Sequence, residues 1–243
     1  VLVFTADVRV QVPPRPPKKG HPKGCPFFIK YMLLLSMGKG DMMNKNDLLY
    51  RIFGYTSFRP GQERLIDSVL SGKDVFGIMP TGGGKSICYQ IPALMLPGIT
   101  LVISPLISLM QDQVAALKAA GVPAAYINST LTGPQVQAVY RTLLAGRYKI
   151  VYVAPERLDY AGFGSVIQKL NVSFLAVDEA HCISQWGQDF RPSYLRIVDF
   201  IDSLPYRPVV GAYTATATIQ VQKDVEKILK LKQPVKAVTG FDR

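Results

Sequence analysis

Tryptophan, histidine and cysteine are the scarcest side chains of this 243-residue chain, which has one, two and three of them. Three cysteines at distant positions predict neither a disulfide framework nor a zinc site, and they fit a reducing compartment. Acidic residues are also few, 17 against 28 lysines and arginines, which gives a formal net charge of +11. Residues 1–45 hold eight of the basic residues and two acidic ones. The remainder is therefore only mildly basic, and its charge alone is not evidence for a nucleic-acid partner.

The apolar stretch at residues 25–37 is too short for a membrane span. It follows a proline- and lysine-rich run, residues 12–24, whose composition does not favour folding. A basic run before an apolar one resembles a signal peptide, but no small-residue cleavage site followed by a secreted-type domain is present. We expect residues 1–45 to be a disordered or non-native extension, with initiation at Met42 or Met43. A weak membrane anchor is the alternative.

Strand-like and helix-like patterns alternate strictly from residue 46 onward. Strands are expected at residues 74–79, 100–104, 124–127, 149–153, 173–177, 208–212 and 235–238. Helices are expected at residues 46–53, 61–70, 85–94, 106–120, 133–145, 163–170, 194–201 and 218–231. Asn46 or Asp47 is the expected cap of the first helix. The alternation predicts an α/β domain over residues 46–243, a mostly parallel sheet with helices on both faces and ligands at the carboxyl ends of the strands.

A glycine-rich stretch at residues 80–86 separates the first expected strand from a helix. Its three consecutive glycines are Gly82, Gly83 and Gly84. Without Cβ atoms they can turn backbone N–H groups toward a phosphate, and the following helix N-terminus also favours anions. In a phosphate-binding loop, Lys85 reaches the β- and γ-phosphates and the Ser86 hydroxyl ligates Mg²⁺. Met79 stands where the strict pattern has its first glycine, so an ordinary glycine turn is the alternative.

Two adjacent carboxylates, Asp178 and Glu179, end the apolar strand expected at residues 173–177. Two acids at such a place are costly to bury, so they need a cation or solvent. Beside a phosphate loop, the first can hold Mg²⁺ through water and the second can orient and deprotonate an attacking water molecule. A solvated acidic turn is the alternative, and His181 alone is weak evidence.

Several motifs together resemble the first motor lobe of a superfamily 2 helicase. These are MPTGGGKS (79–86), DEAH (178–181) and YTATA (213–217). The stretches between them closely resemble the RecQ family of DNA helicases. They are FGYTSFRPGQ (53–62), VISPLISLMQDQV (102–114), VAPERL (153–158) and AHCISQWGQDFRPSYLRI (180–197). The resemblance covers about residues 46–243 and implies a RecA-like P-loop NTPase lobe.

The resemblance implies an ATP site with these roles. Tyr55 and Arg59 would sandwich the adenine, and the amide of Gln62 would hydrogen-bond the adenine edge, to which it offers one donor and one acceptor. Thr81 would belong to the phosphate loop. Phe58, beside them, is interpreted as a core residue.

The resemblance also implies the catalytic groups. Lys85 would bind the phosphates, while Asp178 and Ser86 would hold Mg²⁺. Glu179 would be the base. His181, Thr214 and Thr216 would link the hydrolysis site to the DNA path, although the two threonines are equally well explained as ordinary strand-end residues.

Residues 182–191 resemble the aromatic-rich loop of the RecQ family. Trp186 and Phe190 would stack on unpaired bases, and Arg191 would add phosphate attraction or a cation–π contact. Burial of Trp186 in the core is the alternative. Two turns, residues 104–106 and 155–157, would touch the DNA backbone. Their predicted contact residues are Ser104, Pro105 and Arg157.

The implied function is that of the ATP-binding lobe of a 3′–5′ DNA helicase, which couples ATP hydrolysis to translocation on single-stranded DNA and to duplex unwinding in repair or recombination. Its partners would be single-stranded and partly duplex DNA, with no membrane. It would be cytoplasmic, on the nucleoid of a bacterium, or nuclear in a eukaryote. Residues 241–243 resemble the start of a linker to a second lobe, which the chain lacks. We expect slow hydrolysis and no unwinding. The alternatives are a catalytically incomplete nucleotide- and DNA-binding fragment, and a related RNA helicase.

Overall fold

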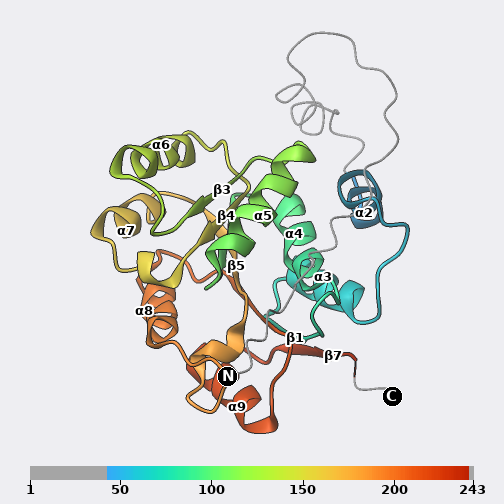
Figure 1. Cartoon of the computed structure of the whole chain (residues 1–243). Helices are drawn as coiled ribbons and strands as arrows, with labels where there is room; N and C mark the ends of the chain where they lie inside the picture. The colour runs from blue at the N-terminus through green and yellow to red at the C-terminus, as the bar shows by residue number, and fades with distance from the viewer. Residues whose placement is uncertain (1–42, 241–243) are drawn as a thin grey trace, which may run out of the picture.

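Seven strands form one parallel sheet in the computed structural model, which describes residues 43–240 (Figure 1). The strands are β1 (Val75–Ile78), β2 (Ile99–Ile103), β3 (Ala124–Ile127), β4 (Ile150–Val153), β5 (Val172–Val177), β6 (Val209–Thr214) and β7 (Val235–Val238). Their order across the sheet is β3-β4-β2-β5-β6-β1-β7, and every neighbouring pair is parallel. Every expected strand is present, so the predicted α/β fold is confirmed. The expectations for residues 1–42 and 241–243 lie outside the described residues.

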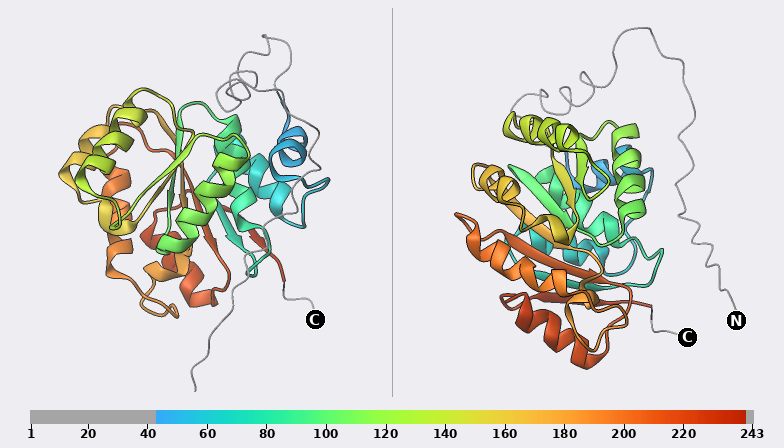
Figure 2. Two further views of the ribbon diagram at one scale, coloured as in Figure 1. Left: turned by 45° about the horizontal axis from the view of Figure 1, so that its top comes forward. Right: turned by 60° about the vertical axis from the view of Figure 1, so that its left-hand side comes forward.

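Helices cover both faces of this sheet (Figure 2). They are α2 (Lys45–Phe53), α3 (Gln62–Leu70), α4 (Lys85–Met95), α5 (Ile107–Ala119), α6 (Gly133–Leu144), α7 (Ala161–Ile167), α8 (Arg196–Ser203) and α9 (Ile219–Ile228). Side chains of α3, α4 and α5 pack in one core layer, and side chains of α6, α7, α8 and α9 pack in the other. Helix α2 contacts α4 and lies at the margin of the first layer. No helix among residues 43–240 is long and apolar enough to cross a membrane.

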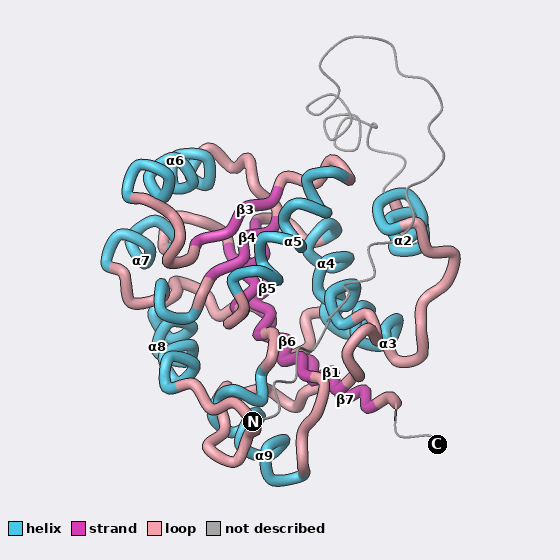
Figure 3. Tube along the Cα trace, in the orientation of Figure 1, coloured by secondary structure: helices cyan, strands magenta, loops and turns pink. Residues whose placement is uncertain are grey.

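Most strands are buried because their residues are apolar on both sides of the sheet, whereas the edge strand β7 is partly exposed. All residues of β1, β2 and β4 are buried, as expected for strands whose two faces are both covered by helices. The tube view shows the strands from β3 and β4 through β5 and β6 to β1 and β7 running across the molecule (Figure 3). Cys88 of α4 is buried in the core.

The first helix begins with a different cap from the one expected. Asn44 is the N-cap: its side-chain oxygen accepts hydrogen bonds from the backbone N–H groups of Asn46 and Asp47, at 2.9 and 3.0 Å. The Asp47 carboxylate in turn accepts from the Asn44 N–H at 3.4 Å, which completes a capping box. The expected cap was therefore wrong by two or three residues, because both candidates lie inside the first turn.

A buried carboxylate joins three segments at the amino edge of the sheet. Asp74, which directly precedes β1, is only 3% exposed and forms an ion pair with Arg207, with 2.6 Å between Asp74 Oδ2 and Arg207 Nη2. It also accepts hydrogen bonds from the backbone N–H groups of Val210, at 2.9 Å, and Lys232, at 2.7 Å. One side chain thereby fixes the starts of β1 and β6 and the connection that leads into β7.

Candidate nucleotide and nucleic-acid site

The predicted motifs meet at the carboxyl edge of the sheet. The phosphate loop follows β1 and the acidic pair follows β5, while β6 lies between these two strands and ends at Thr214. The Met79 N–H donates to the Thr214 carbonyl at 3.0 Å, which ties the start of the phosphate loop to the middle strand. The expectation that the carboxylates lie near the phosphate loop is therefore confirmed, with one strand between them.

The phosphate loop has a conformation that requires glycine. Gly82 and Gly84 have φ angles of +76° and +82°, in the left-handed region. A Cβ atom on Gly83 would lie 2.8 Å from the carbonyl oxygen of Pro80, whose group accepts the Gly83 N–H. The Lys85 ammonium donates to the Met79 carbonyl at 3.2 Å, so it folds back over the loop. The ammonium thus lies where it can exchange a backbone carbonyl for phosphate oxygens.

The adenine-type motif contacts this loop directly. Gln62, which is 3% exposed, accepts a hydrogen bond from the Arg59 N–H at 2.8 Å and donates to the Gly84 carbonyl at 3.0 Å. The Arg59 guanidinium donates to the Gly82 carbonyl. The Tyr55 side chain, a few residues earlier, is exposed. Phe58 packs against the hydrophobic cluster that contains Leu48 and Leu49 of α2, as expected for a core residue. The structure brings Arg59 and Gln62 to the loop, and adenine recognition stays a prediction.

The two carboxylates of the acidic pair have different ionisation. Burial of Asp178, which is 4% exposed, and the charge of Glu179 raise the pKa of Asp178 to about 7, although Lys85 opposes this shift. Burial acts in the same direction on Glu179, but its hydrogen bond to His181 and the charges of Lys85 and His181 outweigh burial, so its pKa is lowered. The pair therefore combines one carboxylate whose pKa is raised by burial with one that ionises readily.

Glu179 begins a chain of side-chain contacts toward β6. Its backbone φ of +48° is in the left-handed region, which is unusual for a residue other than glycine and is typical of functional sites. Its carboxylate lies 3.3 Å from His181 Nδ1, and this nitrogen lies 2.8 Å from the Thr214 hydroxyl. That hydroxyl donates to the Thr216 carbonyl at 3.0 Å. The predicted linking residues are therefore in contact, and their role in coupling stays a prediction.

Trp186 is 73% exposed, which excludes the alternative that it is a core residue. Its backbone N–H donates to the Ser184 hydroxyl at 3.1 Å, and that hydroxyl donates to Asp224 of α9 at 2.6 Å. A Cβ atom on Gly187 would lie 2.3 Å from the His181 carbonyl oxygen. The aromatic-rich loop is thus held against α9 and against the residue that contacts Glu179. The contact between Ser184 and Asp224, 40 residues apart, has no signal in the sequence.

Arg191 connects the aromatic-rich loop to the turn after β2. Its guanidinium pairs with Asp189, with 2.8 Å between Nη2 and Oδ2, and donates to the Pro105 carbonyl at 3.3 Å. Phe190 beside it is half-buried. The ion pair with Asp189, which sequence reasoning missed, reduces the positive charge that Arg191 can offer to a phosphate.

The two predicted backbone-contacting turns differ in accessibility. Ser104 is 1% exposed, and its hydroxyl has no hydrogen-bond partner among residues 43–240. It is buried because it directly continues β2, which lies between β4 and β5, so its side chain does not reach the surface. Pro105 is half-buried, and Arg157 stacks on the exposed Tyr160 ring at 4.7 Å. Contact of DNA with the Ser104 side chain is therefore not supported.

Oxygen atoms suited to a divalent cation are present at this edge. The Ser86 hydroxyl lies in the first turn of α4, and the buried Asp178 carboxylate forms no ion pair within residues 43–240. Hard oxygen ligands of this kind are those that Mg²⁺ prefers, usually together with phosphate oxygens and water. Within the described residues, no group of three or more histidine, cysteine, aspartate or glutamate side chains could hold a metal ion alone. The residues therefore fit a cation that is bound together with a nucleotide.

Replacing Asp178 with asparagine is expected to stabilise the metal-free protein at pH 8. The folded pKa of about 7 lies above the usual value of 3.8, so the folded state binds more protons between the two values, and the carboxylate costs stability as the pH rises through this window. At pH 8 the gain on substitution is on the order of 1–4 kcal/mol, and near pH 4 it disappears. Urea unfolding with a chelator present measures both. An equal gain at the two pH values would show that ionisation is not the cause.

Comparison with known proteins gives a consistent result. The model of the DEAD/DEAH box helicase family matches residues 59–225. The chain is 50% identical over 197 residues to the ATP-dependent DNA helicase RecQ of Pasteurella multocida, a match that covers 81% of this chain and 31% of the relative. It is 51% identical over 197 residues to RecQ of Bacillus subtilis, over 81% and 33% of the two chains. The chain thus spans about a third of the length of these relatives.

Solved structures show the same fold at low sequence identity. The helicase MrfA bound to DNA and AMPPNP has a TM-score of 0.63 at 17% identity, over 82% of this chain and 29% of that one. A hypothetical ATP-dependent RNA helicase from Sulfolobus tokodaii has a TM-score of 0.60 at 23% identity, over 80% and 57%. These similarities confirm the RecA-like lobe that was expected. The chain therefore belongs to the DEAD/DEAH box helicase family, and over 197 of its residues it is about half identical to the two RecQ DNA helicases.

Proposed function

We propose that this chain is the lobe of a DNA helicase that binds and hydrolyses ATP and couples the hydrolysis to translocation on single-stranded DNA. The observation that carries the proposal is one continuous set of contacts at the carboxyl edge. It runs from the acidic pair through His181 to Thr214, whose carbonyl holds the start of the phosphate loop, while the loop of the exposed Trp186 packs on the His181 backbone. The names of the relatives, ATP-dependent DNA helicases, support the same function.

Each residue of the site has a role in the hydrolysis of ATP. Lys85 and the backbone N–H groups of the phosphate loop bind the phosphates and hold them in place. Ser86 and Asp178 would hold Mg²⁺, which, when bound, supplies positive charge to the phosphate oxygens. Glu179, whose lowered pKa keeps it ionised, orients the attacking water and accepts its proton. Positioning and charge do most of the work, because phosphoryl transfer needs little covalent chemistry from the protein.

The link from ATP hydrolysis to DNA begins at the contact between the Glu179 carboxylate and His181. When its carboxylate turns toward a water molecule, its contact with His181 changes, and His181 also contacts Thr214 on β6. The aromatic-rich loop packs on the His181 carbonyl through Gly187. A shift of the histidine therefore reaches the tryptophan loop directly. In the whole protein, 3′–5′ translocation and unwinding would require a second lobe that closes on the bound ATP.

The single tryptophan makes this proposal directly testable. We expect the fluorescence of Trp186 to change when single-stranded DNA is added, because a base stacks on the exposed indole. Trp186→Ala should weaken DNA binding by about 1–3 kcal/mol, or roughly 5- to 150-fold. Fluorescence titration of the parent and polarisation of labelled DNA for the variant measure these effects.

Two controls sharpen the test. Tyr206→Ala removes another exposed aromatic side chain, located before β6 at the opposite edge, and should leave DNA binding unchanged. Both variants should bind Mg-ATP as the parent does. Fluorescence that does not respond to DNA would contradict the proposal. An RNA strand of the same sequence that binds better than DNA would favour the alternative of an RNA helicase.

A further inference from the structure

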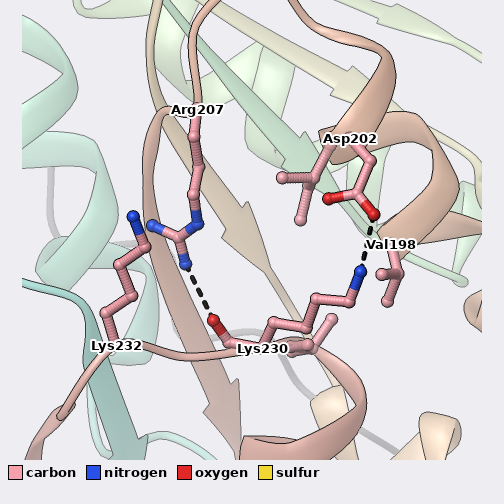
Figure 4. Close-up of a pocket in the computed structure, with 7 residues that line it drawn as sticks. Val198, Asp202, Arg207, Lys230 and Lys232 are labelled. Carbon is pink, nitrogen blue, oxygen red and sulfur yellow. Dashed lines mark hydrogen bonds and ion pairs between the residues drawn. The ribbon is translucent and has the colours of Figure 1, made fainter.

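A cavity lies at the amino edge of the sheet, away from the nucleotide site. Its volume is about 200 Å³, and Figure 4 shows charged side chains converging on it from two sides. Its lining residues are Val198, Ile201, Asp202, Arg207, Leu229, Lys230 and Lys232. Arg207 and Lys232 precede β6 and β7, whereas the phosphate loop and Thr214 come at the other ends of β1 and β6. The six residues of β6 separate the two edges by roughly 20 Å, at about 3.3 Å per residue.

The charges at the cavity do not cancel. Arg207 is neutralised by the buried Asp74, and Lys230 pairs with Asp202 at 2.7 Å. The Lys232 ammonium takes part in no ion pair among residues 43–240. The pair of Lys230 and Asp202 is more than half exposed, so it contributes little and can be exchanged for another partner. One uncompensated cation and one easily released cation therefore face the cavity.

The inner wall of the cavity is apolar. Ile201 of α8 and Leu229 at the end of α9 are buried core residues, and the half-buried Val198 lies beside them. An apolar wall under a cationic rim is the usual arrangement of a pocket that takes an apolar group with an attached anion. A bare phosphate would leave this wall without a partner, so the shape of the site does not favour a nucleic-acid backbone.

The cavity is also rigid. The Arg207 guanidinium donates to both oxygens of Asp74 and to the carbonyls of Pro208 and Lys230. Lys230 itself has a φ of +49°, a conformation that side-chain-bearing residues rarely adopt. The Lys232 backbone N–H is held by Asp74. A preformed site pays less in ordering when it binds a ligand, so the strained loop favours binding.

We propose that this cavity binds an acidic peptide segment of a partner protein. A bulky apolar side chain of the segment lies in the cavity beside the half-buried Val198, above the buried Ile201 and Leu229. A neighbouring carboxylate pairs with Lys232 and displaces Asp202 from Lys230. Charge complementarity selects an acidic partner, and the apolar wall selects a protein over a nucleic acid. Because the nucleotide site lies at the other edge of the sheet, the partner can remain bound while ATP and DNA bind.

The test uses a fluorescein-labelled peptide of sequence Gly-Ser-Asp-Asp-Leu-Asp-Asp-Ser-Gly and the full 243-residue chain. Fluorescence polarisation should show saturable binding that weakens with added salt, since it depends on charge. Lys232→Glu reverses the uncompensated charge on an exposed side chain and should weaken binding at least about tenfold. Lys223→Glu, on the exposed surface of α9 and outside the cavity, is the matched control and should bind like the parent.

A second peptide, with serine in place of leucine, tests the apolar wall and should bind at least about tenfold more weakly. Equal binding by the two peptides, or equal weakening by Lys232→Glu and Lys223→Glu, would overturn the proposal in favour of general charge attraction. Absence of saturable binding would also overturn it. If Lys232→Glu impaired binding of single-stranded DNA and not of the peptide, the cavity would belong to a nucleic-acid surface. Unchanged Mg-ATP affinity shows that the variants are folded. Failure of the parent chain to bind single-stranded DNA would contradict the proposed function and leave the peptide site untouched.

Discussion

Replacing Asp74 with alanine is expected to lower the free energy of unfolding by about 3–5 kcal/mol. The substitution leaves the Arg207 guanidinium, only a quarter exposed, without its anion, and leaves the N–H groups of Val210 and Lys232 without acceptors. A buried charge without a partner is much more costly than the pair was stabilising. The starts of β6 and β7 would lose their common attachment to the start of β1.

Urea unfolding of the parent and the variant measures this effect. Asp202→Ala is the matched control, because it removes the other carboxylate at the same cavity from a pair that is more than half exposed. It should change stability by no more than about 1 kcal/mol. Similar losses of unfolding free energy for the two variants would show that the pair of Asp74 and Arg207 contributes no more than an ordinary surface ion pair.

Replacing Glu179 with glutamine is expected to lower the rate of ATP hydrolysis by about 10²- to 10⁴-fold, the usual contribution of a positioned base. Glutamine keeps the shape and a hydrogen bond toward His181, but it cannot accept the proton of the attacking water. Mg-ATP binding should be nearly unchanged. Single-turnover hydrolysis with protein in excess over ATP measures the rate even where turnover is slow.

Lys85→Ala provides the complementary variant. It should weaken Mg-ATP binding by about 1.5–3 kcal/mol, the scale of a charged hydrogen bond, or roughly 10- to 150-fold. Calorimetric titration separates the two variants, since one keeps binding and loses hydrolysis while the other loses binding. If Glu179→Gln hydrolysed ATP at the parental rate, another group would have to be the base.

The order of elements was predictable because local chemistry determines it. Apolar runs bounded by glycine and proline gave the strands within two residues, and the glycine turn identified the phosphate loop although Met79 replaces a glycine. The structure explains the replacement: Met79 is buried in the core beside Cys88, so its position needs an apolar side chain and no unusual backbone. The departure from the strict pattern is therefore a packing feature.

What the sequence could not show depends on contacts between distant residues. The short 3₁₀ turn Ala180–Ile183 was not expected, and the turn Pro192–Leu195 was partly merged with the following helix, because turns of four residues leave no periodic pattern. The burial of Ser104 depends on its strand lying between two others. The ion pair of Asp74 with Arg207 joins residues that are 133 positions apart. None of these follows from local propensity or spacing.

The place of β1 in the sheet has a consequence for synthesis of the chain. Its two neighbours are β6 and β7, and both lie more than a hundred residues later in the sequence. At about 5–20 residues per second, the ribosome needs roughly 7 to 27 seconds to reach β6 after it has made β1. During that time an apolar strand with two open edges awaits its partners, which is the condition that favours wrong pairing with other chains. The strand that leads into the phosphate loop is therefore made early and completed late, and it waits longer for its first partner than any other strand of the described sheet.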